Sequence, residues 1–145
     1  MKNVEQILKN KPQPQAVYTI RPDDSVLDAL KMLAEKNVGA LPVVENNQVV
    51  GIVSERDYAR KLVLKGRSSA ATPVRDIMSA PVVTVEPKQN LEYCMNLMTD
   101  RHLRHLPVVS NGELLGLLSI GDLVKETIAE QASLIKQLEQ YIRGE

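Results

Sequence analysis

Two aspartates of this chain, Asp57 and Asp122, each follow a serine by three positions at the end of the same short motif. The two copies read Gly51-Ile-Val-Ser54-Glu-Arg-Asp57 and Gly116-Leu-Leu-Ser119-Ile-Gly-Asp122. A ribose offers two neighbouring hydroxyls, and one ionised carboxylate can accept a hydrogen bond from each. The serine hydroxyl can donate to a phosphate or to the ribose, at a strand-to-helix junction whose free N–H groups favour anions. We therefore predict that both aspartates bind a ribose diol, although Ser-x-x-Asp is also a helix capping box that needs no ligand.

The motif lies inside an internal repeat that pairs residues 19–58 with residues 84–123 without a gap. Identical pairs include Thr19 with Thr84, and Leu41-Pro42-Val43-Val44 with Leu106-Pro107-Val108-Val109. A periodic copy of this kind requires that each unit be interpreted together with the other. The duplication favours ligand binding over a capping box alone.

Both copies predict the same order of elements. A helix with one apolar face comes first, and the matching faces are Val26, Ala29, Leu30 and Leu33, then Leu91, Cys94, Met95 and Met98. Two apolar runs with a polar turn between them predict a strand, a turn and a strand over residues 40–54 and 106–119. Helices follow over residues 55–64 and 120–141, short helices precede each copy over residues 4–8 and 74–78, and residues 66–73 link the halves.

Proline stands in the first strand of each pair, at Pro42 and Pro107. Because proline cannot donate to an interior ladder, each strand begins at the proline or lies at a sheet edge. We expect the backbone there to be open, so that apolar residues can sandwich an adenine while main-chain groups recognise its nitrogens.

Composition excludes several classes of function. The 145 residues fit one compact domain, and 18 basic residues balance 18 acidic ones, which disfavours a nucleic-acid or anionic-membrane partner. The sequence has no apolar run of membrane-spanning length, and residues 1–11 lack the continuous apolar stretch of a signal peptide, so we expect neither feature. The single cysteine, Cys94, agrees with a cytoplasmic location and is expected in the core.

The two halves differ in their basic residues. We predict Arg104 as the leading phosphate ligand with His105 beside it, and a solvated basic turn is the alternative. Arg56 is also predicted to approach a phosphate, whereas the second copy has Gly121 at that position, so the two clefts are expected to prefer different ligands. Further basic residues are predicted to form a solvated face, namely Arg60, Lys61, Lys65 and Arg67. His102 and His105 lack the companions of a metal site, and no metal is predicted.

Each copy is closed by the same pattern, which is glycine, two apolar residues, serine, two variable residues and aspartate. The duplicated order of elements with this pattern resembles the tandem cystathionine-β-synthase (CBS) domain pair, or Bateman module. The resemblance implies an α/β (α+β) fold of two pseudo-symmetric β-α-β-β-α repeats. The predicted boundaries are residues 1–70 for the first repeat with its N-terminal helix, 71–127 for the second, and 128–145 for a C-terminal helix extension. The resemblance also implies a homodimer. An apolar stripe along the last helix extends beyond the second repeat, and its distal half is expected to pack on the N-terminal helix or on a second subunit.

The resemblance implies a regulatory module that binds AMP, ADP, ATP or NAD in the clefts between the repeats, with S-adenosylmethionine ranked behind them, and that signals to a separate effector protein. A ligand-free assembly scaffold is the alternative. We predict no catalytic residue and no enzyme, because the sequence contains neither a phosphate loop nor a nucleophile with a base. The predicted ligand-binding residues are Thr19, Ile20, Ala40, Leu41, Pro42, Ser54, Arg56, Asp57, Thr84, Val85, Arg104, His105, Pro107, Ser119, Gly121 and Asp122.

Overall fold

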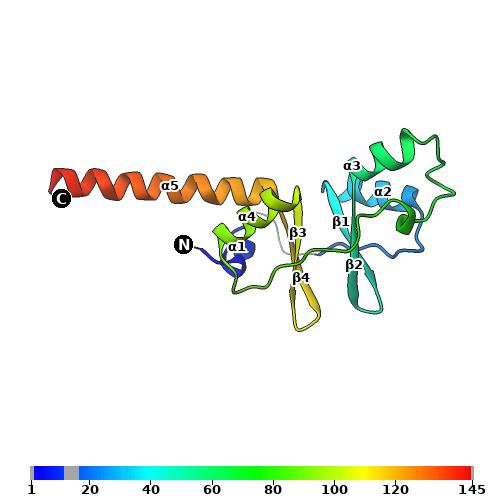
Figure 1. Ribbon diagram of the computed structural model, residues 1–145, viewed down its shortest axis with the longest axis horizontal. Coiled ribbons are helices and arrows are strands. Elements are labelled where there is room, and N and C mark those ends of the chain that lie inside the picture. Colours follow the sequence, from blue (N-terminus) through cyan, green and yellow to red (C-terminus); the bar gives the residue numbers. More distant parts are fainter. Residues whose placement is uncertain (1, 12–16, 145) are drawn as a thin grey trace. The chain divides into compact units, whose positions relative to one another are not determined.

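The computed structural model describes residues 2–11 and 17–144, which form two discontinuous compact units (Figure 1). The described residues of the first unit are 2–11, 85–108 and 116–144, and those of the second are 17–84 and 109–115. The predicted repeat boundaries therefore differ from the boundaries of the compact units and stay a prediction. Their outer ends, residues 1 and 145, lie outside the described residues.

The second unit contains helix α2 (Val26–Lys36), strands β1 (Ala40–Glu45) and β2 (Gln48–Ser54), and helix α3 (Glu55–Asp57). The Ser25 hydroxyl caps α2 by accepting from the Asp28 N–H at 3.0 Å. β1 and β2 pair antiparallel, and the turn residues Asn46 and Asn47 have φ of 51° and 63°, as a type I′ hairpin requires. The predicted helix over residues 55–64 is present, but after α3 it continues as the π-helix η1 (Tyr58–Val63).

The first unit contains helices α1 (Val4–Lys9) and α4 (Leu91–Arg101), and strand β3 (His105–Ser110) begins in it. β3 pairs with β4 (Glu113–Ser119), and the helix α5 (Ile120–Arg143) follows directly. The turn between the strands repeats the first hairpin, since Asn111 and Gly112 have φ of 53° and 80°. Both predicted hairpins and the long helix are confirmed, and the chain has the predicted α+β fold with two small antiparallel sheets.

The short helix before each repeat packs in the unit that holds the other repeat. Val4 at the start of α1 donates its N–H to the Gln89 carbonyl at 2.8 Å, in the second copy. The 3₁₀-helix η2 (Val74–Asp76) does the same in the first copy, where the Val74 N–H donates to the Asp24 carbonyl at 2.8 Å. Asp24 and Gln89 are paired positions of the repeat, so the two contacts correspond. The exchange of α1 places residues 2–11 in the first unit, together with residues 85–108.

The predicted helix faces form the core. In the second unit, Val26, Ala29 and Leu33 lie in an apolar cluster with strand and η2 residues. In the first unit, Cys94 has no exposed surface, as predicted, and burial raises the pKa of its thiol to about 11. These cores hold the ends of β2 and β4, where the two Ser-x-x-Asp motifs begin.

The backbone edge beside each proline is not open, which corrects the sequence-based expectation. The Pro42 carbonyl accepts from the Ile20 N–H at 3.1 Å, and Ile20 forms a parallel bridge with Val43. The Pro107 carbonyl accepts from the Val85 N–H at 3.0 Å in the same way. The segment before each helix of the repeat therefore covers the edge that was expected to face a ligand.

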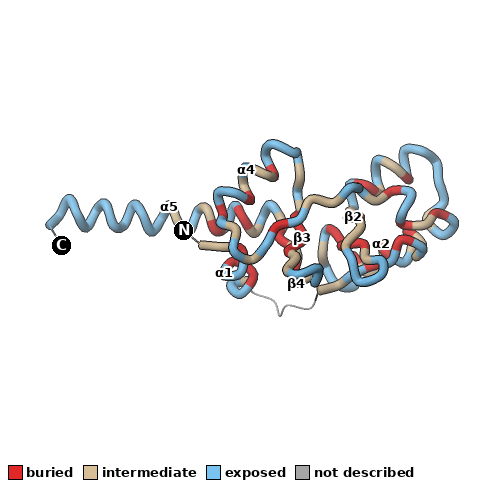
Figure 2. Tube along the Cα trace, turned by 60° about the horizontal axis from the view of Figure 1, so that its bottom comes forward, coloured by how far each residue is buried: buried red, intermediate tan, exposed pale blue. Residues whose placement is uncertain are grey.

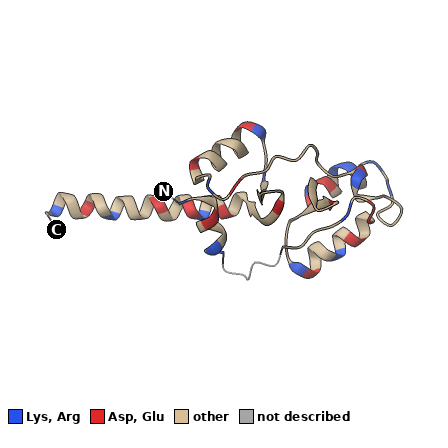
Figure 3. Cartoon of the chain, turned by 90° about the horizontal axis from the view of Figure 1, so that it is seen from below, with Lys and Arg blue, Asp and Glu red and all other residues tan. Residues whose placement is uncertain are grey.

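The distal part of α5 is exposed on all sides within the described structure (Figure 2). Large apolar side chains recur along it, including Ile128, Ile135, Leu138 and Ile142, which are 53–82% exposed. Acidic and basic residues are interspersed along the same helix (Figure 3). No helix among residues 2–11 and 17–144 is long and apolar enough to cross a membrane.

Candidate functional site

Both Ser-x-x-Asp motifs form reciprocal capping boxes at a strand-to-helix junction. The Ser54 hydroxyl accepts from the Asp57 N–H at 3.2 Å, and the Asp57 carboxylate accepts from the Ser54 N–H at 3.0 Å. Ser119 and Asp122 make the same pair of bonds at 3.1 and 2.8 Å. The sequence-based alternative of a cap is thus realised, and it fixes each carboxylate at the first turn of a helix.

The Asp57 carboxylate is buried and surrounded by donors. Its Oδ2 accepts from the Ser54 hydroxyl at 3.0 Å in addition to the backbone bond, and its Oδ1 accepts from the Ser79 hydroxyl at 3.1 Å. Lys61 Nζ lies 3.1 Å from Oδ1 and also donates to the Ile77 carbonyl at 3.1 Å. Lys61 was predicted to belong to a solvated face; its side chain is 44% exposed and forms an ion pair with Asp57.

The Asp122 carboxylate has fewer partners and more exposure. Among the described residues, its recorded partners are the Ser119 N–H and Lys11 Nζ, which lie 2.8 and 3.0 Å from Oδ2. Lys11 Nζ also donates to the Leu117 carbonyl at 3.0 Å. The Asp122 side chain is 22% exposed, against 10% for Asp57.

The glycine of each motif lies in a closely packed place. An added Cβ at Gly51 would lie 2.8 Å from Met78 Sδ and 2.9 Å from the Ser79 carbonyl oxygen. At Gly116 it would lie 2.9 Å from Leu8 Cδ2. Met78 follows the exchanged helix η2 and Leu8 lies within α1, so this part of the motif serves the fold rather than a ligand.

The predicted cations lie near the starts of the two helices. Arg104 is exposed, and its carbonyl accepts from the Ile120 N–H of α5 at 2.8 Å. His105, the first residue of β3, is partly buried, and Arg56 is exposed in α3. Gly121 is exposed in the first turn of α5.

The remaining predicted residues divide by exposure. Thr19 and Thr84 are exposed, whereas the other residues of this group are buried, namely Ile20, Ala40, Leu41, Pro42, Val85 and Pro107. Leu41 has no exposed surface and lies in the core, so its side chain cannot contact a ligand in this arrangement. The binding roles of these residues stay predictions.

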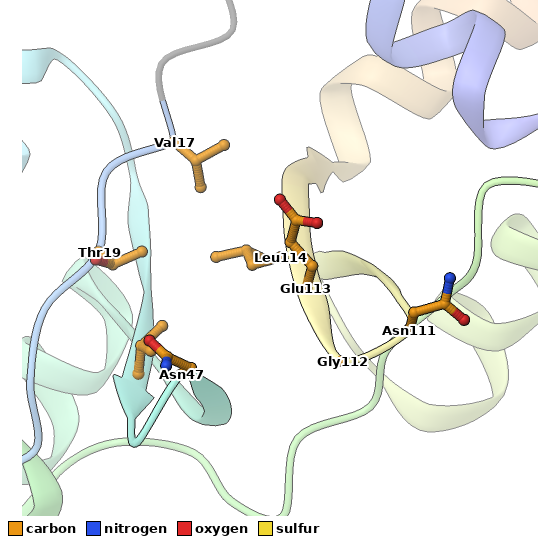
Figure 4. Close-up of a pocket in the computed structure, with 8 residues that line it drawn as sticks. Val17, Thr19, Asn47, Asn111, Gly112, Glu113 and Leu114 are labelled. Atoms are coloured by element: carbon orange, nitrogen blue, oxygen red, sulfur yellow. The ribbon is translucent and has the colours of Figure 1, made fainter.

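One pocket of the second unit has a volume of about 410 Å³ and was not predicted from sequence (Figure 4). Val17, Thr19 and Asn47 lie on one side of it, opposite Glu113 and Leu114. Thr19 is the only predicted residue in its lining, and neither motif aspartate contributes.

Sequence reasoning missed Lys11, Lys61 and Ser79. Lys61 could have been found, because it stands four positions after Asp57 on one helix. Lys11 and Ser79 lie outside the gapless repeat, and no spacing signal connects them to the motifs. The described residues contain no group of His, Cys, Asp and Glu side chains that could hold a metal ion.

Comparison with known proteins defines the class of this chain. A family model of the CBS domain matches residues 4–64 and again residues 74–129. The chain therefore belongs to the CBS-domain family and carries a tandem pair of CBS domains, as the sequence predicted.

Particular relatives extend this result. The chain is 42% identical to the mitochondrial CBS domain-containing protein CBSX3 of Arabidopsis thaliana over 127 residues, which cover 84% of this chain and 62% of that protein. A CBS-domain protein of Burkholderia ambifaria MC40-6, described as a candidate signal-transduction protein, is 55% identical with a TM-score of 0.84, over 90% of this chain and 96% of that one. The chain is also similar to CBSX2, whose structure was solved in complex with AMP. The two sequences are 30% identical and the two structures have a TM-score of 0.71, over 89% of this chain and 98% of that one.

Proposed function

We propose that this CBS pair is a regulatory module that binds an adenosine nucleotide, AMP, ADP, ATP or NAD, and signals to a separate effector protein. The observation that carries the proposal is the duplicated capping box, which holds an aspartate and a serine at the same backbone position in both repeats. The relative CBSX2, which was solved with AMP, supports the choice of an adenosine nucleotide.

The chemistry of the motif suits a nucleoside phosphate. The Asp122 carboxylate presents Oδ1 for ribose hydroxyls, while Oδ2 is held by the Ser119 N–H. Arg104 and Lys11 lie on the same unit and supply positive charge for phosphate oxygens. Nothing in this set requires a catalytic cofactor or a reacting nucleophile, so the proposal is binding without catalysis.

The second candidate function is a ligand-free assembly scaffold, and the exposed apolar stripe of α5 favours it. Isoleucine recurs every seven residues at 128, 135 and 142, and Leu138 lies three positions after Ile135, a spacing that matches the seam of a two-stranded coiled coil in the last two turns, while Gln131 is the polar residue of this seam. We propose that α5 joins two copies of this chain. This homodimer is compatible with nucleotide sensing, because a ligand can bias the arrangement of two subunits.

Nucleotide binding is tested by calorimetry and by thermal shift with AMP, ADP, ATP and NAD. A ligand at a hundred times its Kd stabilises the folded protein by about 2.7 kcal/mol, which raises Tm by roughly 5–11 °C for a chain of this size. Cytidine monophosphate and inorganic phosphate are the controls and should give a smaller shift. Equal shifts for adenosine nucleotides and for inorganic phosphate would refute adenosine recognition, and no shift with any nucleotide would leave the scaffold.

The dimer is tested by light scattering on the eluted protein. The parent should have twice the 16.1 kDa mass of the chain. Leu138→Lys should give the single-chain mass, because a lysine in an apolar seam leaves a buried charge without a partner. Gln140→Lys on the polar face of α5 is the matched control and should stay dimeric. A dimer that survives Leu138→Lys would show that α5 is not its interface.

A further inference from the structure

The two repeated aspartates have the same sequence context but different partners. Each oxygen of Asp57 has two donors, from Ser54 on one side and from Ser79 and Lys61 on the other. A carboxylate offers about four acceptor positions in all, so these donors use the capacity of Asp57. Among the residues that the structure describes, the two partners of the Asp122 carboxylate are the Ser119 N–H and Lys11 Nζ, and both contact Oδ2. Asp122 therefore retains the acceptor capacity that a ribose diol needs.

Exposure agrees with this difference. The whole Asp57 residue, backbone included, is 8% exposed, and it is one of the few buried charged residues in the described chain. Removing a donor from a buried carboxylate leaves polar groups without partners, which is costly. The carboxylate of Asp122 is the more exposed of the two, with 22% of its side chain exposed against 10% for Asp57, whereas the paired lysines, Lys11 and Lys61, are 31% and 44% exposed. Because partly exposed ion pairs are weak, a ligand can replace the contact of Lys11 with Asp122 at little cost.

Positive charge is also placed differently in the two copies. The first residue of α5, Ile120, donates its N–H to the Arg104 carbonyl at 2.8 Å. At the paired positions of the first copy, the Glu55 N–H at the start of α3 donates to the Gly39 carbonyl at 3.2 Å. The second copy thus places Arg104 beside the start of its helix, whereas the first copy has Gly39 and Glu55 at the paired positions and carries its arginine, Arg56, one residue further along α3. A phosphate is attracted to Arg104 in the second arrangement, whereas in the first the Glu55 carboxylate opposes the attraction of Arg56.

We infer, resting on the proposed function, that the nucleotide binds at Asp122 alone, with Lys11 as a phosphate ligand, and that Asp57 instead fixes the fold. Lys11 leaves Asp122 Oδ2 for the phosphate when the nucleotide binds, and Asp122 then accepts the ribose hydroxyls. Asp57 keeps the end of β2 tied to Ser79 and Lys61. Each chain consequently takes one nucleotide, although both copies satisfy the same motif.

The experiment is calorimetric titration of the full chain with AMP and with adenosine. Asp122→Asn should lower the AMP affinity about ten- to a hundredfold, the usual range for hydrogen bonds to a charged group. Lys11→Met should lower the AMP affinity about tenfold and change the adenosine affinity less than about twofold, because adenosine carries no phosphate. Lys61→Met is the matched control and should leave both affinities unchanged. The parent should bind one AMP per chain.

Asp57→Asn tests the other half of the inference, and it should keep the AMP affinity while lowering Tm. If that variant does not fold, Ser79→Ala weakens the same network without changing the carboxylate and should also keep the affinity. Two AMP per chain, or a loss of AMP affinity in Lys61→Met equal to that in Lys11→Met, would overturn the inference and leave the proposed function intact. A parent that binds no nucleotide would refute the proposed function and this inference with it.

Discussion

Replacing Gly51 by alanine tests the packing of the exchanged helix η2 against β2. The new Cβ would lie 2.8 Å from Met78 Sδ and 2.9 Å from the Ser79 carbonyl oxygen, and the second contact is with backbone. Relief requires the Ser79 segment to move away from β2, to which it is joined by two hydrogen bonds between Ile52 and Ser79, of 3.1 and 2.8 Å. Overpacking costs about 1–3 kcal/mol, and each weakened hydrogen bond adds up to about 1 kcal/mol. We expect a loss of about 2–4 kcal/mol.

Gly116→Ala is the internal control, because it makes the same change at the paired position. Its Cβ would meet Leu8 Cδ2 at 2.9 Å, which is the end of a flexible side chain that can rotate. The loss of unfolded-state freedom stabilises alanine by about 0.4–1 kcal/mol and offsets much of the strain. We expect a change of less than about 1 kcal/mol at this site.

Thermal unfolding followed by circular dichroism distinguishes the two variants. Gly51→Ala should lower Tm by roughly 5–15 °C and Gly116→Ala by less than about 4 °C. Equal losses in both variants, or a larger loss for Gly116→Ala, would contradict the reasoning that a backbone contact costs more than a side-chain contact.

Three further predictions follow from single features. Cys94 should react with a thiol reagent far more slowly in the folded than in the unfolded protein, because its side chain is buried. Burial raises the pKa of the Cys94 thiol to about 11, so the labelling rate should rise with pH up to about that value. Rapid labelling of the folded protein at neutral pH would contradict this. Ser119→Ala should lose about 1 kcal/mol of stability in chemical denaturation, since it removes the cap of α5, and an unchanged midpoint would show that the cap is dispensable. Asn47, with φ of 63°, should tolerate glycine without loss, whereas Asn47→Val should cost about 1–2 kcal/mol, and equal stability of both variants would contradict the assigned turn.

The elements were predictable because their signals are local. The turn at Asn46-Asn47 and the cap at Ser25 act within a few residues, so sequence alone indicates where each strand or helix begins and ends. The exchange of the leading helices was not predictable in this way. The contact of Val4 with Gln89 joins residues far apart in the chain, and helical periodicity does not reveal which repeat a helix packs on. The same limit explains the covered edges at Pro42 and Pro107.

The candidate site was predictable in its motif but not in its asymmetry. Spacing identified Asp57 and Asp122 as equivalent, and their capping geometry is indeed the same. What distinguishes them comes from Ser79 and Lys11, which lie outside the repeated segment. A duplicated sequence therefore predicts duplicated backbone geometry, whereas the chemistry of each copy depends on unrepeated neighbours.

A crystal structure of the full chain grown with AMP tests the central claim most directly. The account predicts that the ribose hydroxyls lie within hydrogen-bond distance of the Asp122 carboxylate, at about 2.5–3.0 Å, with the phosphate near Lys11 or Arg104. An AMP whose ribose does not reach Asp122, such as one seated beside Thr19 and Asn47, would contradict it.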